Sequence, residues 1–297
     1  MLRGWARCPS SSPERPAGGR SWSGNRSTRA WRRGRRRPPR RRVPTWCSSS
    51  RSRTTKRARR RRRWRRGGSG AAELLDADES DQALLLRRVH PGTRLVDASL
   101  AVEEHLVAGA DVLRRLGAVE VGPGLFPDLA AVAGEVADAT EERAARLAPT
   151  APYPLDVGLV AHAVRLLRSL PAGADRVGLA HGDLNPGNVL RSDANGWLAI
   201  DPKPVWGDLA WDPWPLLTQV GDWVDVVAQP PDLVARTRLV ADGVGLDPAR
   251  VAAWCTARSV TSGLWAADRG WWTGFRGADG DLARALAWSR ATGLLSA

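Results

Sequence analysis

The stretch HGDLNPGNVL, residues 181–190, decides how the rest of this chain is interpreted. Asp183 is followed by Asn188, and a second aspartate, Asp201, closes an apolar run thirteen residues after Asn188. An aspartate that can accept a hydroxyl proton, followed by two hard oxygen ligands for a divalent cation, is typical of a phosphoryl-transfer site. Alone, Asp201 before a proline would be a turn and His181 a satisfied core histidine. Their order in one motif favours the functional interpretation.

A β-hairpin is predicted between the two ligands. The intervening segment VLRSDANGWLAI, residues 189–200, has two apolar runs separated by Asn195-Gly196, which is a strong turn signal. Because the two ends of a hairpin meet, Asn188 and Asp201 are expected at the same edge of the sheet.

Two segments carry a family resemblance. HGDLNPGNVL and AIDPKPVWGDLAWDPWPLL, residues 199–217, resemble the aminoglycoside phosphotransferase family, and within it the streptomycin 6-kinase branch of aminoglycoside/hydroxyurea resistance kinases. The resemblance covers about residues 70–297 by element order. It implies an α+β, protein-kinase-like fold with a mostly helical C-lobe. It also implies ATP and Mg²⁺ as cofactors and transfer of the ATP γ-phosphoryl group to a hydroxyl of a streptomycin-like antibiotic.

The same resemblance implies roles for single residues. Asp183 would be the catalytic base, with His181 supporting its loop, and Asn188 and Asp201 would be the metal ligands. Asp208 matches a family acid that orders the loop after the metal aspartate.

The motif departs from the branch at Asn185, where histidine is common. We expect this change to be tolerated, because the position is neither the base nor a metal ligand.

The family's N-lobe should supply a Gly-rich strand pair, a strand lysine and a helical glutamate. Residues 1–70 contain none of these. The only lysines are Lys56, inside an arginine run, and Lys203, which matches the branch's AIDPK segment.

Charge divides the chain into two parts. Residues 1–70 hold 25 Lys and Arg and one acid, whereas residues 71–297 hold 20 Lys and Arg and 30 Asp and Glu, a net charge of −10. The first part is rich in Arg, Ser, Pro and Gly and poor in aliphatic residues, so we expect a disordered basic arm. Residues 71–297 are long enough to bury one sizeable core.

The arm has competing interpretations. Its arginines and interleaved tryptophans could bind nucleic acid, or an anionic membrane surface. The preferred alternative is translation in a wrong frame, which would also explain why no N-lobe is encoded there. Nucleic acid is therefore expected as a partner only if the arm is genuine.

The remaining elements follow from local patterns. Two strands, 71–78 and 81–89, are predicted as a remnant of the N-lobe sheet, followed by a turn at His90-Pro91-Gly92. The interlobe linker would contact the nucleotide at Leu86, Arg88 and Val89. A C-lobe over 90–297 is then predicted with a strand at 177–180 and helices capped by Asp97 or Ser99 (ending near Gly117) and at 128–147, 156–170, 214–219, 231–243, 248–268 and 279–294.

The acidic domain suits a small cationic antibiotic. The candidate substrate contacts are Asp208, Asp212 and Asp222, with Asp225 and Asp268 as further acids near the site. For each, a helix cap or a surface charge is the competing explanation.

Localisation is predicted from what the sequence lacks. It shows no secretory signal, no membrane span, and three cysteines without metal spacing, which favours a reducing cytoplasm. Three hypotheses remain: a kinase whose N-terminus is a frame error, a truncated and weak or inactive kinase, and a non-catalytic kinase-like protein whose basic arm binds nucleic acid.

Overall fold

A single helix, α8 (Pro248–Ala267), forms the centre of the structure. The computed structural model describes residues 70–78, 83–221, 226, 229–272 and 280–295. Asp247 caps α8 by accepting hydrogen bonds from Ala249 N and Arg250 N, and Pro248 occupies the first turn, where its missing N–H costs nothing. Most of α8 is apolar on every face and buried, as expected for a helix surrounded by others.

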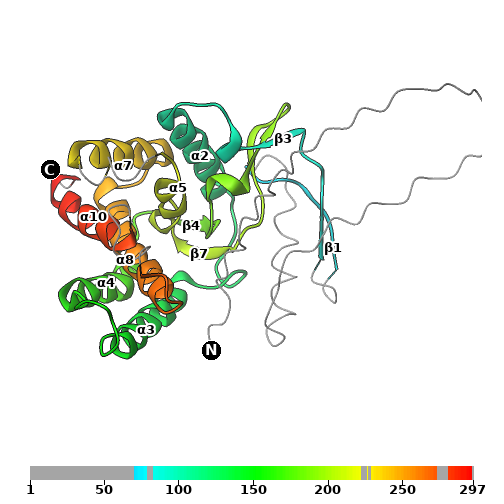
Figure 1. Cartoon of the computed structure of the whole chain (residues 1–297). Helices are drawn as coiled ribbons and strands as arrows, with labels where there is room; N and C mark the ends of the chain where they lie inside the picture. The colour runs from blue at the N-terminus through cyan, green and yellow to red at the C-terminus, as the bar shows by residue number, and fades with distance from the viewer. Residues whose placement is uncertain (1–69, 79–82, 222–225, 227–228, 273–279, 296–297) are drawn as a thin grey trace, which may run out of the picture.

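The other helices pack around α8 or onto its neighbours (Figure 1). They are α2 (Val102–Gly117), α3 (Leu129–Leu147), α4 (Val157–Ser169), α5 (Trp214–Thr218), α7 (Pro230–Val244) and α10 (Asp281–Leu295). The predicted helix ranges are confirmed to within a few residues. None of the described helices combines the length and apolarity needed to cross a bilayer.

One predicted cap is wrong. Helix α2 begins after Ala101, and its first turn is satisfied by Glu104, whose carboxylate accepts from Ala101 N at 2.8 Å. Asp97 instead forms an ion pair with Arg94 at 2.6 Å. The side chain three residues inside the helix therefore replaces the predicted cap before it. By contrast, Asp156 caps α4 as predicted, by accepting from Leu159 N.

The strands form three small sheets. The predicted hairpin is confirmed as β5 (Val189–Ser192) and β6 (Gly196–Ala199), and β3 (Pro91–Arg94) adds to β5 on its other side. The predicted turn at residues 90–92 is therefore wrong, because Pro91 starts β3 opposite Ser192, a position where a strand tolerates proline. β4 (Val177–Ala180) pairs antiparallel with β7 (Val205–Asp208).

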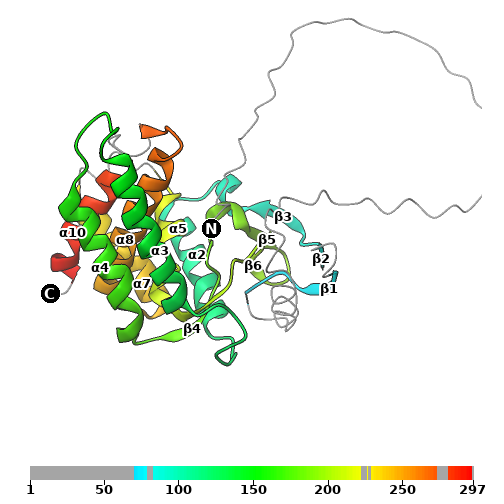
Figure 2. The same ribbon diagram turned by 90° about the horizontal axis from the view of Figure 1, so that it is seen from below.

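The remaining pair, β1 (Leu74–Asp78) and β2 (Ala83–Leu86), confirms the two strands predicted at 71–78 and 81–89. It projects from the side of the molecule opposite α10 in both views (Figures 1 and 2). Leu85 is 59% exposed there. The chain enters this pair beside β6, since Ala199 N donates to Gly70 O at 2.7 Å and Ala72 N donates to Ala199 O at 2.9 Å.

Candidate active site

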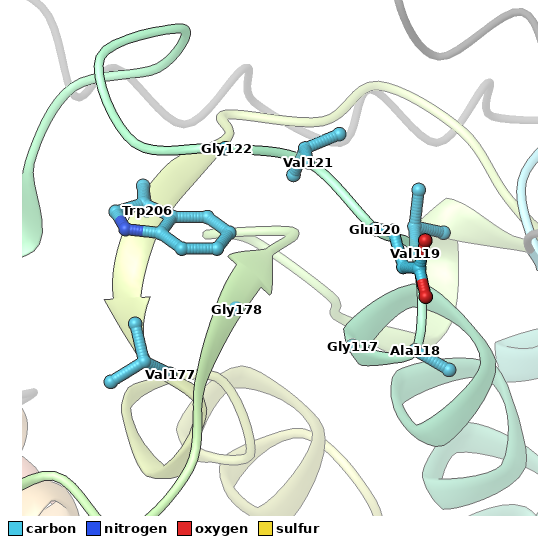
Figure 3. A pocket seen from close by; sticks show the side chains of 9 residues that line it. All are labelled: Gly117, Ala118, Val119, Glu120, Val121, Gly122, Val177, Gly178 and Trp206. Atoms are coloured by element: carbon cyan, nitrogen blue, oxygen red, sulfur yellow. The ribbon is translucent and has the colours of Figure 1, made fainter.

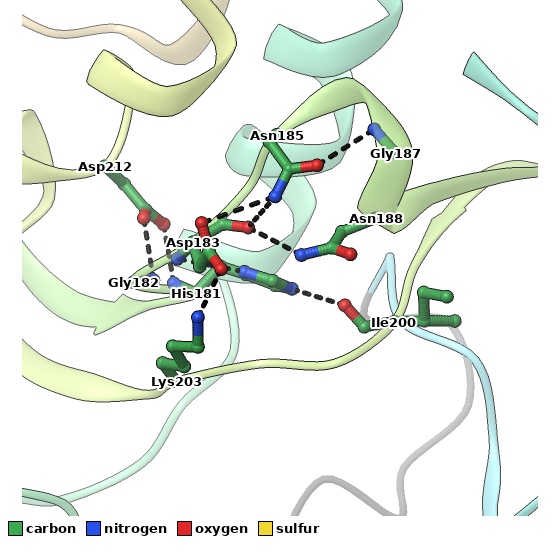
Figure 4. Close-up of polar contacts among 9 residues, drawn as sticks. All are labelled: His181, Gly182, Asp183, Asn185, Gly187, Asn188, Ile200, Lys203 and Asp212. Carbon is green, nitrogen blue, oxygen red and sulfur yellow. Dashed lines mark hydrogen bonds and ion pairs between the residues drawn. The ribbon is translucent and has the colours of Figure 1, made fainter. Parts of the chain in front are cut away.

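Two loops that leave the β4–β7 pair form the candidate site. Their strands are in register from Val177 opposite Asp208 to Ala180 opposite Val205. Lys203 N donates to His181 O at 2.8 Å, which continues the ladder beyond the strands. The loop that follows β4 and the segment that precedes β7 therefore run side by side, as Figure 4 shows for Asp183 and Lys203.

His181 is a buried spacer between the two loops. Its Nε2 lies 3.0 Å from Ile200 O, and its Nδ1 lies 3.3 Å from Asp183 N. A backbone N–H can only donate, so Nδ1 accepts and the ring proton is on Nε2. Complete burial lowers the pKa of His181 to about 4, despite the bond to Ile200. The ring is thus neutral and shapes the loop.

Asp212 fixes the start of the same loop by accepting hydrogen bonds from its backbone. One carboxylate oxygen accepts from His181 N at 2.5 Å and the other from Gly182 N at 2.7 Å. Burial raises the pKa of Asp212 to about 6, while the two N–H donors and the nearby Arg258 guanidinium oppose this shift. Asp212 is 3% exposed, so the predicted substrate contact is wrong: its oxygens are committed to backbone donors.

Arg258 is a buried cation that the sequence analysis missed. Its Nη1 donates to Trp211 O at 2.7 Å, and its guanidinium lies over the rings of Trp211 and Trp214, with centroid distances of 4.2 and 4.7 Å. Burial lowers its pKa to about 10. The tryptophans between Asp208 and Pro215 were the available signal, since aromatic faces accommodate a buried arginine.

Asp183, the predicted base, faces outward. Its side chain is 21% exposed and accepts from Lys203 Nζ at 2.6 Å and from Asn185 Nδ2 at 3.3 Å (Figure 4). Asn188 Nδ2 donates to the Asp183 backbone oxygen at 3.0 Å. Asn185 also accepts from Gly187 N. The position that departs from the family motif therefore contacts the predicted base directly.

The two predicted metal ligands both lie at the open end of the β5–β6 hairpin. Ile200 N donates to Asn188 O at 2.9 Å, so Asp201 follows immediately at the same edge. Because Asn188 Nδ2 faces the Asp183 carbonyl, its Oδ1 is the atom able to ligate. Asp201 is exposed and has a φ of 51°, a left-handed conformation that no other non-glycine residue among those described adopts.

These donors fit magnesium. No group of three or more His, Cys, Asp or Glu side chains in the described ranges could enclose a metal. A metal here would be held by one carboxylate, one amide oxygen, and phosphate or water oxygens. Mg²⁺ is commonly bound in this way beside nucleotides.

The predicted nucleotide contacts run from the end of β2 to the turn end of the β5–β6 hairpin. Leu86 ends β2, Arg88 is exposed and Val89 is partly buried, just before β3. Since β3 runs antiparallel to β5, this linker approaches the turn end of the hairpin. About four residues of strand, roughly 13 Å, separate that end from Asn188.

Asp208 is also internal, which corrects its prediction as a substrate contact. Its side chain is 1% exposed and accepts from Arg250 Nε and from Trp254 Nε1, both at 2.6 Å. These bonds tie the end of β7 to α8. Asp268 forms ion pairs with Arg143 and Arg146. Asp222 and Asp225 lie outside the described residues.

A hollow of about 430 Å³ lies between residues 117–122 and the β4–β7 pair (Figure 3). Trp206 and Glu120 are among the residues that line it. None of the predicted site residues does, so this hollow is separate from the candidate active site.

The helical body, the small sheets and the paired loops together define the protein-kinase-like fold of aminoglycoside phosphotransferases and choline kinases. The choline kinase LicA of Streptococcus pneumoniae aligns with a TM-score of 0.50 and 14% identity, over 81% of this chain and 83% of that one. At this identity the likeness concerns the fold alone. The chain belongs to the aminoglycoside/hydroxyurea antibiotic resistance kinase family, whose model matches residues 48–270.

Two curated relatives support this assignment. A streptomycin 6-kinase of Streptomyces glaucescens is 36% identical over 208 residues, which cover 66% of this chain and 62% of the relative. A hydroxyurea phosphotransferase of Kitasatospora aureofaciens is 33% identical over 225 residues, covering 68% and 56%. The chain therefore spans less than two thirds of the length of these relatives. The family match begins at residue 48, inside the predicted basic arm, which lies outside the described residues up to residue 69.

The protonation of His181 can be tested directly. Its ring should stay neutral down to about pH 5 and carry its proton on Nε2. Because the folded pKa lies below the unfolded value, the stability gained from the neutral ring is present above pH 6.5 and is lost as the pH falls towards 4. Nitrogen-15 NMR of the imidazoles reports both properties. A midpoint at 6.5, or a proton on Nδ1, would contradict the assignment.

The structural role of Asp208 predicts a stability effect. Arg250→Leu leaves a buried carboxylate without its cation and should destabilise the fold by about 3–5 kcal/mol, measured by urea denaturation. Adding Asp208→Asn should recover part of this loss, because it removes the uncompensated charge. Arg165→Leu, at an exposed arginine of α4, is the matched control and should change stability by less than about 0.5 kcal/mol. Equal losses in both arginine variants would contradict the role.

Proposed function

We propose that this protein is a phosphotransferase that moves the γ-phosphoryl group of ATP to a hydroxyl of an aminoglycoside-type antibiotic, with streptomycin as the first candidate. The observation that carries the proposal is the Asp183 carboxylate. It is partly exposed, held on both oxygens, and lies on a loop whose Asn188 is bonded through its backbone to Ile200, the residue before Asp201. Membership of a resistance kinase family and the identity to a streptomycin 6-kinase support the choice of substrate.

In the proposed reaction Asp183 orients the acceptor hydroxyl and accepts its proton. His181 and Asp212 keep the loop in place from the interior, so that the carboxylate reaches outward in one orientation. Most of the rate enhancement would come from positioning and from charge stabilisation.

Asn188 and Asp201 would hold Mg²⁺, and the linker residues Leu86, Arg88 and Val89 would contact the nucleotide base. When bound, the metal would offset the negative charge of the phosphates. Val89 precedes β3 at the turn end of the hairpin and Asn188 precedes β5 at its open end, an arrangement suited to an extended nucleotide.

The antibiotic would be recognised partly by charge. Residues 71–297 carry a net charge of −10, which favours a cationic molecule. Because Asp208 and Asp212 are buried, the attraction for the antibiotic would come from other acids. Asp201 is exposed at the opening, but in this proposal its carboxylate binds the metal that accompanies the nucleotide.

The proposal is tested with the full chain and purified acceptors. Wild-type protein should convert ATP to ADP only when an acceptor is present, with streptomycin preferred over hydroxyurea. Asp183→Asn should lower kcat by about 10²- to 10⁴-fold, because the variant cannot accept the proton. Asp193→Asn, at the turn of the same hairpin, removes an equal charge and should leave kcat unchanged. Acceptor-independent turnover, or an active Asp183→Asn variant, would contradict the proposal.

The metal role of Asp201 gives a separate prediction. Activity should disappear on chelation and return with Mg²⁺. Asp201→Asn should raise the Mg²⁺ concentration for half-maximal activity by at least roughly tenfold, since the only carboxylate of the pair is lost. A metal titration of this variant beside Asp193→Asn measures the shift, and identical curves would remove Asp201 from the metal site.

A further inference from the structure

Lys203 is placed against the predicted base by its own backbone. Its N–H donates to His181 O at 2.8 Å, and a Cβ on Gly182, which has a φ of 81°, would collide with the Lys203 carbonyl oxygen. Pro202 and Pro204 flank it, and a residue before proline is restricted to extended conformations. The Lys203 backbone is therefore confined beside Gly182, and from there its Nζ reaches Asp183 Oδ2 at 2.6 Å.

The ion pair between Lys203 and Asp183 contributes little to folding. The Lys203 side chain is 48% exposed, and solvent weakens such a pair. The fold does not need this contact to hold the loop, because backbone bonds to His181 and Gly182 already do so. A role in the reaction explains better than a role in folding why a cation lies 2.6 Å from the predicted base at the opening of the site.

The two oxygens of Asp183 are held differently. Lys203 Nζ lies 2.6 Å from Oδ2, whereas Asn185 Nδ2 lies 3.3 Å from Oδ1. The longer contact is the weaker one, so Oδ1 is the oxygen that an incoming hydroxyl can engage. An ammonium group has three donors and can hold Oδ2 and a phosphoryl oxygen together.

We propose that Lys203 orients Asp183 through Oδ2 and binds the phosphoryl group during its transfer. This assignment rests on the proposed function. The acceptor oxygen forms a bond to the γ-phosphorus, and the bond from that phosphorus to the bridging oxygen breaks, leaving its electron pair on ADP. The acceptor proton passes to Asp183 Oδ1. Lys203 gives up no proton and keeps its charge throughout.

A lysine suits this role better than an arginine would. Lys203 is the only lysine in the described residues, and it follows Asp201 by two positions. A compact ammonium on a flexible stem can follow a phosphoryl group as it moves between donor and acceptor. A planar guanidinium at this position is less able to keep both contacts.

The test compares Lys203→Met and Lys203→Arg with Arg191→Met, an exposed arginine on β5 of the neighbouring sheet. Lys203→Met should lower kcat for the acceptor by about 10²- to 10³-fold, the loss typical of one transition-state donor. The KM for the acceptor should change less than about threefold, and the urea midpoint should be unchanged. Lys203→Arg should recover part of kcat, and Arg191→Met should match wild type.

Chemical rescue separates a charge from a purely structural role. Methylammonium should raise the kcat of Lys203→Ala in proportion to its concentration and should have no effect on Asp183→Asn. If wild type is active and Lys203→Met keeps more than about a third of kcat, or if the amine gives no rescue, the Lys203 assignment is wrong while the proposed function stands. If wild type has no acceptor-dependent turnover, the proposed function fails and this assignment fails with it.

Discussion

The candidate site depends on a buried carboxylate that accepts two backbone hydrogen bonds. Asp212 binds the N–H groups of His181 and Gly182, and so fixes the point where the chain leaves β4. A buried anion is stable only with such donors, and Arg258 lies close enough to lower its pKa. If this contact were lost, two backbone N–H groups of the loop would need other acceptors. The backbone position from which the Asp183 side chain extends would then no longer be fixed.

A second internal carboxylate extends the same principle. Asp208 ties the end of β7 to α8 through Arg250 and Trp254. The β4–β7 pair is thus attached to the helical core at both ends, by Asp212 at one and Asp208 at the other. The acids of the second motif divide into two groups: those that are buried and hold backbone or helices, and Asp201, which is exposed.

The sequence predicted what is local. The hairpin needed only its turn and its two apolar runs, and the helices needed their periodicity and caps such as Asp156. The errors arose where tertiary contacts decide. Pro91 was read as a turn because β5, its partner, is about a hundred residues away in the chain, and an isolated proline carries no sign of a strand.

The fate of the carboxylates could not be predicted for the same reason. Asp208 and Asp212 stand four residues apart in a segment rich in tryptophan, and nothing local distinguishes a buried acid from a substrate contact. The distinction depends on Arg250, Trp254 and Arg258, which all come from α8. Likewise, the spacing of twenty residues between Asp183 and Lys203 does not reveal that two loops bring them together.

Charge balance gives a physical reason for placing both a metal and a lysine at the opening of the proposed site. Asp212 and Arg258 offset each other in the interior, and His181 is neutral, so the field at the opening is set by Asp183, Asp201 and Lys203. A triphosphate brought to two carboxylates would be repelled unless cations lie between them. Asp201 can share its charge with a metal, whereas Asp183 must stay available to a hydroxyl. A cation fixed to Oδ2 of Asp183 leaves Oδ1, which carries only the longer contact from Asn185, for the acceptor.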